Sequence, residues 1–265
     1  MERIKTTFEC THQQGRIALI PYLPVGYPDL ETTLALAPAL AEAGADLFEL
    51  GVPYSDPQAD GATIQRATHQ ALQNGVTPRI CLETAAAIRR TVDVPLLLMS
   101  YYNPICRFGN VAFCQAAAEA GVDGLIVPDL PPEEASDLLA AADAHRLDLI
   151  FLVAPTSTEE RLRIVASEAS GFIYCVSLSG VTGARAQLSS GLADYLARVR
   201  RFSDLPLAVG FGISHPEHVH EVARHADGAI VASALIDRLD ALAPEERVAG
   251  VAAYVRQLAA ATTRE

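Results

Sequence analysis

Eight short apolar runs recur along the chain, and they constrain its fold more than any other feature. They occupy residues 17–23, 46–51, 95–100, 124–127, 148–153, 172–176, 206–210 and 228–231. Runs of this length that are almost continuously apolar are typical of strands in a parallel sheet that is buried on both faces. The sequence therefore predicts eight parallel strands.

Amphipathic, alanine-rich segments separate these runs, including residues 29–43, 108–120, 132–145, 158–169 and 191–201. Each is long enough for a crossover helix, and Gly44 suits the left-handed position after the first of them. The phrases EAGADLFEL, EAGVDGLIV and RHADGAIV also repeat a passage from a helix end through Asp into a strand. We predict a single α/β domain over residues 1–265, a (β/α)8 TIM barrel with an extra N-terminal helix and extra helices after strands 2 and 8.

Composition excludes several classes of protein. Half of the residues are hydrophobic and 20% are charged, which suits a globular protein with a large core. The net charge of -12 argues against a nucleic-acid partner, because phosphate neutralisation needs clustered Lys and Arg. Residues 1–16 lack the apolar core of a signal peptide, and no apolar run reaches the roughly 18 residues of a membrane span. We expect a cytoplasmic protein whose five cysteines are reduced.

Two carboxylates flank the loop that follows the second predicted strand, in the stretch FELGVPYSDPQADG. Glu49 stands between Phe48 and Leu50. A carboxylate in an apolar setting loses favourable hydration free energy unless it is paired or protonated, or it is kept there for a function. Active sites of this fold lie at the C-terminal ends of the strands, so Glu49 and Asp60 are expected at the barrel mouth. The structural alternatives are a salt bridge for Glu49 and a turn or helix cap for Asp60.

A phosphate site is predicted where strands 7 and 8 end. Gly210 and Gly212 in VGFGIS leave backbone N–H groups accessible, and a helix that starts at Ser233 would direct its positive end to the same place. Loops at these positions form the common phosphate site of the fold. The alternative is that both glycines are ordinary turn residues.

A long connection, SLSGVTGARAQLSSGL, follows the sixth predicted strand over residues 177–192. Loops of this length are usually lids or disordered segments, and we predict a lid over the phosphate, with Gly183 adding backbone donors. Tyr174, on the strand before it, either points its hydroxyl into the mouth or fills the barrel.

The basic and metal-binding residue types narrow the reaction class. A Schiff-base aldolase needs a lysine on a barrel strand, whereas the one lysine, Lys5, lies in the leading helix. His215, His218 and His220 in HPEHVH lack a clear completing carboxylate, so an exposed helix start is predicted rather than a metal site. General acid–base catalysis by Glu49 and Asp60 remains, in an isomerisation or a carbon–carbon cleavage.

The blocks ELGVPYSDPQADG, GVTGAR and GFGIS, with the small-residue turn at Ser233, resemble the α subunit of tryptophan synthase over nearly the whole chain. The resemblance implies retro-aldol cleavage of indole-3-glycerol phosphate to indole and glyceraldehyde 3-phosphate, in L-tryptophan biosynthesis. It also implies a β subunit that carries pyridoxal phosphate, an α2β2 assembly, and no cofactor in this chain.

The resemblance implies roles for individual residues as well. Glu49 would be the general acid–base, Asp60 would interact with the indole N–H, and Tyr174 would lie close to the reacting groups. The implied phosphate-binding residues are Gly183, Phe211, Gly212, Ala232 and Ser233. The implied indole pocket is lined by Tyr22, Ile64, Tyr101, Ile126 and Leu152. The implied partner interface contains Asp56, Asn103 and Pro104, although Asp56 is alternatively a turn residue before Pro57.

The sequence departs from the family pattern at three positions. Ala232 stands where Gly is expected, and Pro24 and Ala62 replace Thr and Pro. These departures bear on the phosphate site and on the loop around Asp60. Three alternative functions stay open: a stand-alone lyase that releases indole, a non-catalytic barrel that activates its β partner, and a phosphosugar isomerase.

Overall fold

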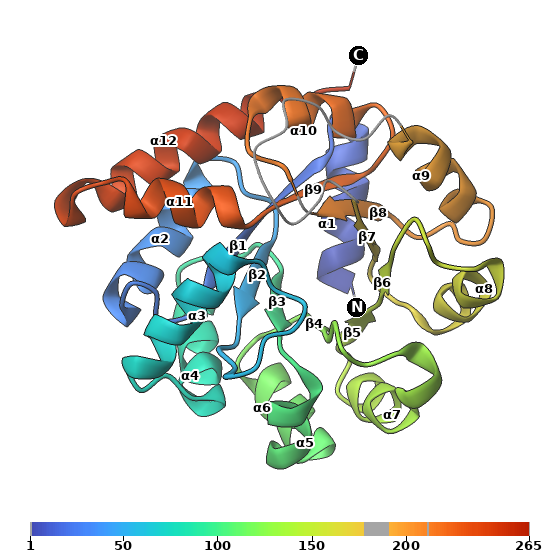
Figure 1. The fold of residues 1–265 in the computed structure, drawn as a ribbon, viewed down its shortest axis with the longest axis horizontal. Helices are drawn as coiled ribbons and strands as arrows, with labels where there is room; N and C mark the ends of the chain where they lie inside the picture. Colours follow the sequence, from blue (N-terminus) through green and yellow to red (C-terminus); the bar gives the residue numbers. More distant parts are fainter. Residues whose placement is uncertain (1, 178–190, 211, 265) are drawn as a thin grey trace.

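The computed structural model describes residues 2–177, 191–210 and 212–264. Its strands form one parallel sheet in the order β5-β4-β3-β2-β1-β9-β8-β7-β6, and Figure 1 shows helices ringed around them. The strands are β1 Ala18–Pro24, β2 Phe48–Gly51, β3 Leu96–Met99, β4 Gly124–Ile126, β5 Asp148–Ile150, β6 Leu152–Val153, β7 Ile173–Val176, β8 Leu207–Gly210 and β9 Gly228–Val231. The predicted TIM barrel is confirmed.

The fifth predicted strand differs from expectation because it is divided at Phe151. Its first part, β5, pairs with β4, whereas its second part, β6, pairs with β7. The Phe151 carbonyl accepts a hydrogen bond from the Tyr174 N–H at 3.0 Å, so the contact with β7 continues across the division. One apolar run thus pairs first with β4 and then with β7.

The helices match most of the predicted segments. They are α1 Glu2–Gln13, α2 Leu30–Glu42, α3 Ala62–Gln73, α4 Pro78–Arg89, α5 Tyr102–Phe108, α6 Asn110–Glu119, α7 Ser136–Ala144, α8 Glu159–Glu168, α9 Leu192–Arg200, α10 Pro216–Ala223, α11 Ser233–Asp240 and α12 Arg247–Ala260. Gly44 follows α2 with φ of +105°, as expected. The predicted helix over 108–120 is shorter, because Gly109 at φ +94° separates it from the unpredicted α5. Within the described ranges, no helix could cross a membrane.

The repeated aspartates explain why the phrases before the strands resemble one another. The carboxylates of Asp46, Asp123 and Asp227 accept the N–H at the start of a neighbouring strand, from Leu19, Leu96 and Leu207, at 2.9, 2.8 and 2.8 Å. Each also pairs with arginine: Asp46 with Arg16, Asp123 with Arg3 and Arg89, and Asp227 with Arg200 and Arg264. Each repeat therefore joins two strands at the N-terminal end of the barrel.

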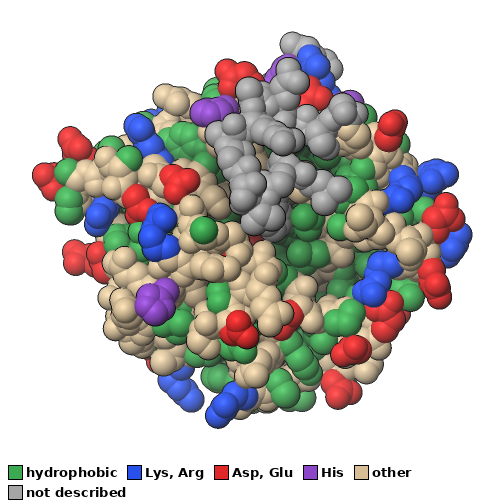
Figure 2. All heavy atoms as spheres, in the orientation of Figure 1, with side chains coloured by type: hydrophobic (Ala, Val, Ile, Leu, Met, Phe, Trp, Pro, Cys, Tyr) green, Lys and Arg blue, Asp and Glu red, His purple; other side chains and the backbone are tan. Residues whose placement is uncertain are grey.

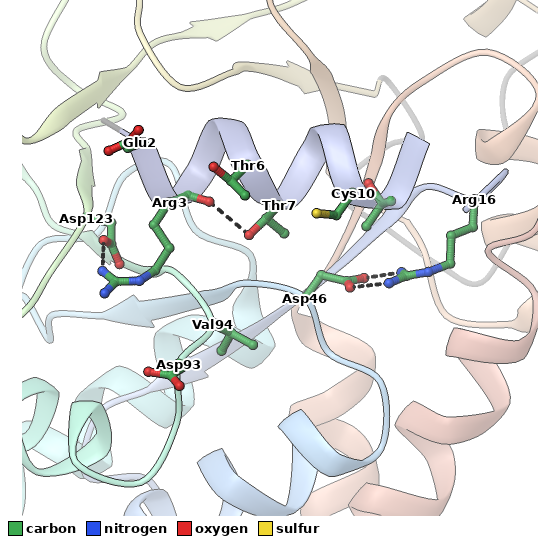
Figure 3. A pocket seen from close by; sticks show the side chains of 11 residues that line it. Glu2, Arg3, Thr6, Thr7, Cys10, Arg16, Asp46, Asp93, Val94 and Asp123 are labelled. Carbon is green, nitrogen blue, oxygen red and sulfur yellow. Dashed lines mark hydrogen bonds and ion pairs between the residues drawn. The ribbon is translucent and has the colours of Figure 1, made fainter. Parts of the chain in front are cut away.

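Helix α1 closes that end of the barrel. Ile4 and Phe8 pack with inward-facing strand residues, and the rings of Phe8 and Phe172 lie 5.6 Å apart. Beside α1 is a pocket of 690 Å³, and Figure 3 shows Arg3 and Arg16 reaching across it to Asp123 and Asp46. Arg3 thus ties α1 to the strands and Arg16 ties the segment after it, so we assign this pocket to stability and expect the chemistry at the opposite end.

Candidate active site

Glu49 lies on β2 and faces the barrel interior. It is level with Tyr22 on β1 and with Leu97 on β3, and Leu97 belongs to the cluster that fills the barrel. The side chain is buried, and no described residue hydrogen-bonds its Oε2 atom. Burial, reinforced by the nearby charge of Asp60, raises the pKa of Glu49 to about 8. The salt bridge considered as an alternative is absent among the described residues.

Asp60 lies near the end of the loop between β2 and α3, just before the N-cap residue Gly61, and is half-buried. Burial raises its pKa to about 6, while a hydrogen bond from the Tyr101 hydroxyl acts in the opposite direction. The same hydroxyl accepts the Ala59 N–H at 2.8 Å, and the Tyr101 ring packs on Tyr54 with centroids 5.2 Å apart. Tyr101 therefore anchors the loop that carries Asp60.

Two tyrosines stand at the same end of the barrel, each lying over a glycine on the adjacent strand. A Cβ atom added to Gly51 would collide with the ring and hydroxyl of Tyr22, and one added to Gly210 would collide with those of Tyr174. Both tyrosines are buried, and burial raises the pKa of each well above its usual value. The charges of Glu49 and Asp60 act in the same direction on both tyrosines, so the four groups form one electrostatic cluster.

The predicted apolar lining divides between two faces of the barrel wall. Ile126 is buried in the barrel-filling cluster with Tyr174, and Leu152 packs against it. Ile64, on α3, is buried in the larger core that also contains Tyr22. Figure 2 shows a hollow bordered by hydrophobic side chains near the centre of the face seen in Figure 1. The position of Glu49 in this apolar end accounts for its desolvation.

The predicted phosphate residues lie in two neighbouring turns. Gly212 follows β8 with φ of +82°, a conformation that favours glycine. Ala232 is the N-cap of α11 and makes no side-chain cap, so the N–H groups that begin at Ser233 stay available to an anion. Gly183 and Phe211 lie outside the described residues, as does most of the predicted lid.

The predicted interface residues occupy the surface beside the mouth. Asp56 is exposed in the loop after β2, Asn103 is exposed on α5, and Pro104 beside it is half-buried. Tyr101 immediately precedes α5 and binds Ala59, so the two segments are physically linked. They therefore form adjacent parts of one surface.

The histidine segment differs from its prediction in one respect. His215 is the exposed N-cap residue of α10, but His218 is buried. The reason is that the His218 ring turns back onto the preceding loop, where its Nδ1 accepts the Ser214 N–H at 3.3 Å. The helix start is therefore exposed only in part.

Known proteins match this sequence over the whole chain. The family model for the tryptophan synthase alpha chain matches residues 8–263. A tryptophan synthase alpha chain of Chloroflexus aggregans is 60% identical over 265 residues, which cover 100% of this chain and 99% of that one. One from a Roseiflexus species is 57% identical over 259 residues, covering 97% and 99%. The chain belongs to the tryptophan synthase alpha chain family.

Solved structures of the family share the fold closely. Tryptophan synthase of Mycobacterium tuberculosis matches with a TM-score of 0.92 and 43% identity, covering 99% of each chain. Tryptophan synthase subunit alpha of Legionella pneumophila matches with a TM-score of 0.92 and 37% identity, covering 99% of this chain and 98% of that one. This chain therefore shares its barrel fold with these structures over nearly its whole length.

The three departures from the family pattern have local explanations. Ala232 has φ of -119° and ψ of -85°, outside the left-handed region, so a methyl group is accommodated without that strain. Pro24 is the last residue of β1, and the ladder continues past it because the Val25 N–H donates to the Gly51 carbonyl at 3.0 Å. Ala62 is the first residue of α3, a position at which the N–H has no intrahelical acceptor.

Sequence reasoning missed the structural roles of two glycines. No local pattern marks Gly51, and the pattern at Gly210 indicates only a backbone that an anion can approach. Both make room for a tyrosine whose strand partner lies two residues earlier, Glu49 for Tyr22 and Ala208 for Tyr174. The signal is a Tyr whose partner on the adjacent strand lies two residues before a glycine at the strand end. It can be recognised only when the strand register is known.

Proposed function

We propose that the chain cleaves indole-3-glycerol phosphate to indole and glyceraldehyde 3-phosphate by general acid–base catalysis, as the alpha half-reaction of tryptophan synthase. The observation that carries the proposal is the buried carboxyl group of Glu49, with a pKa of about 8, at the strand end facing the mouth. A carboxyl group in this setting holds a proton at neutral pH and can donate it to carbon.

Glu49 would protonate C3 of the indole ring. The bond between C3 and the glycerol side chain then breaks, its electrons return to the ring, and the hydroxyl on the side-chain carbon loses its proton as the aldehyde forms. Glu49, now ionised, helps to take that proton. The unpaired Oε2 atom supports this role, because no described residue competes for it.

Asp60 would stabilise the positive charge that this proton transfer creates. Protonation at C3 places positive charge on the indole nitrogen, which an ionised carboxylate stabilises as the carbon–carbon bond breaks. The hydrogen bond from Tyr101 favours the ionised form of Asp60. Tyr174 would lie beside the reacting groups, and its electrostatic coupling to Glu49 supports that placement.

The substrate's two ends would be held by separate parts of the mouth. The phosphate would bind at Gly212, Ala232 and Ser233, with Gly183 and Phe211. The indole ring would lie among Tyr22, Ile64, Tyr101, Ile126 and Leu152. The uncapped start of α11 supports the first assignment. The burial of Tyr22, Ile64, Tyr101 and Ile126, with Leu152 partly buried, supports the second.

The partner would be a tryptophan synthase β subunit that contacts Asp56, Asn103 and Pro104. In that assembly, of α2β2 composition and cytoplasmic, the β subunit holds the pyridoxal phosphate and receives the indole. This chain would need no cofactor, because proton transfer and electrostatic stabilisation by Glu49 and Asp60 suffice for the cleavage.

Turnover of indole-3-glycerol phosphate by the purified chain, measured with and without added β subunit, tests the function. We expect cleavage that is slow alone and rises on complex formation, because the loop carrying Asp60 also carries the interface residue Asp56. High activity alone with no binding indicates a stand-alone lyase instead. Binding without any cleavage indicates a non-catalytic activator, and cleavage by neither preparation refutes the proposed activity.

The pH dependence of kcat/KM should be bell-shaped. Asp60 acts ionised, so activity is lost as the pH falls through its pKa of about 6. Glu49 acts protonated, so activity is lost as the pH rises through its pKa of about 8. Initial rates at low substrate concentration measure these free-enzyme values. Activity that keeps rising above pH 8 would contradict the assignment of Glu49 as the acid.

A further inference from the structure

His218 contacts the loop that follows β8 from within α10. Its Nδ1 atom accepts the Ser214 N–H at 3.3 Å and lies 3.5 Å from the Ser214 hydroxyl oxygen. Burial lowers the pKa of the ring, and His215 acts in the same direction, whereas a hydrogen bond to the Gly212 carbonyl and the charge of Glu217 raise it. The ring is thus largely neutral at pH 7, which leaves Nδ1 free to accept.

A second helix holds the same loop. The Tyr254 hydroxyl, on α12, donates to the Ser214 carbonyl at 2.9 Å. Residue 214 is therefore held on its N–H side by His218 and on its carbonyl side by Tyr254. Two side chains from different helices thus restrict a segment of three residues, 212–214.

The held segment presents unused backbone donors. Among the described residues, neither the Gly212 N–H nor the Ile213 N–H has an acceptor, although Ile213 is only 3% exposed. The Gly212 carbonyl and the Ile213 N–H belong to one trans peptide group and point in opposite directions within its plane. A carbonyl held toward His218 therefore turns that N–H away from the ring. Gly212 is exposed, but Ile213 is buried, and a buried donor without an acceptor is rare in proteins and needs an explanation.

We propose that His218 is a positioning residue of the phosphate site: by holding Ser214 and the Gly212 carbonyl, it keeps the Ile213 N–H group, next to Gly212, oriented for a phosphate monoester. The inference rests on the proposed function, because it deepens the phosphate assignment of Gly212. His218 itself does not touch the reacting atoms. Its contribution belongs to binding of the phosphate and not to the cleavage step.

The test compares three variants: His218→Ala, His218→Asn, whose amide oxygen can replace Nδ1 as acceptor, and Tyr254→Phe. For His218→Ala we expect KM for indole-3-glycerol phosphate and Kd for glycerol 3-phosphate to rise about 10-fold, the effect of losing one buried hydrogen bond, with kcat within about 2-fold. Asn should restore most of the affinity, and Tyr254→Phe should weaken it similarly to Ala. His69→Ala, an exposed histidine on α3, is the control.

Unchanged glycerol 3-phosphate affinity in both His218→Ala and Tyr254→Phe would overturn the proposal. So would equal losses in His218→Ala and His218→Asn that follow their melting temperatures, since that pattern marks a purely structural residue. If the wild-type chain binds glycerol 3-phosphate but does not cleave indole-3-glycerol phosphate, the proposed function fails, while the binding measurements still decide the role of His218.

Discussion

Replacing Glu49 by Gln should lower kcat for indole-3-glycerol phosphate cleavage about 10³-fold, because an amide of the same shape has no acidic proton to give to indole C3. KM should change little, since the group is buried and carries no charge at neutral pH when its pKa is about 8. Single-turnover assays of the complex with the β subunit would measure the effect on the cleavage step itself.

The controls for Glu49 separate chemistry from folding. Glu83, exposed on α4, can be changed to Gln without an expected effect on kcat. Binding of the β subunit should survive Glu49→Gln, because this side chain lies inside the barrel rather than on the surface that carries Asp56. Unchanged turnover in Glu49→Gln would show that Glu49 is not the general acid of the reaction.

Replacing Asp60 by Asn should lower kcat/KM about 10²- to 10³-fold, because positive charge on the indole nitrogen then lacks its anionic partner. The variant should also change the pH profile at both ends. The acidic limb near pH 6 disappears with the group that titrates there. The alkaline limb moves to lower pH, because the charge of Asp60 is one of the two causes that raise the pKa of Glu49.

Asp93→Asn serves as the matched control for Asp60, since Asp93 is exposed and lines the pocket at the opposite end of the barrel. Its pH profile should equal that of the wild type. If Asp60→Asn retains the acidic limb, another group titrates near pH 6. If the alkaline limb does not move, the electrostatic coupling between the two carboxyl groups is weaker than their arrangement implies.

Much of the barrel could be predicted from sequence because its signals are local. An apolar run marks a strand, an amphipathic segment marks a crossover helix, and the strand-end rule then places Glu49 at the mouth. Two predicted elements had the wrong bounds. The fifth strand is divided at Phe151, where pairing passes from one neighbouring strand to another, and the helix predicted over 108–120 is divided at Gly109 by a backbone turn.

The order of the elements and the presence of an apolar-flanked carboxyl group at a strand end followed from residue pattern alone, because hydrophobic periodicity and chain direction are properties of contiguous residues. Three features depended on the tertiary structure. These are the seating of Tyr22 over Gly51, the non-left-handed conformation of Ala232, and the burial of His218 against Ser214. Each joins or shapes segments through register and packing, which no local pattern contains. The pKa of Glu49 is of the same kind, since the neighbours that desolvate it come from separate strands.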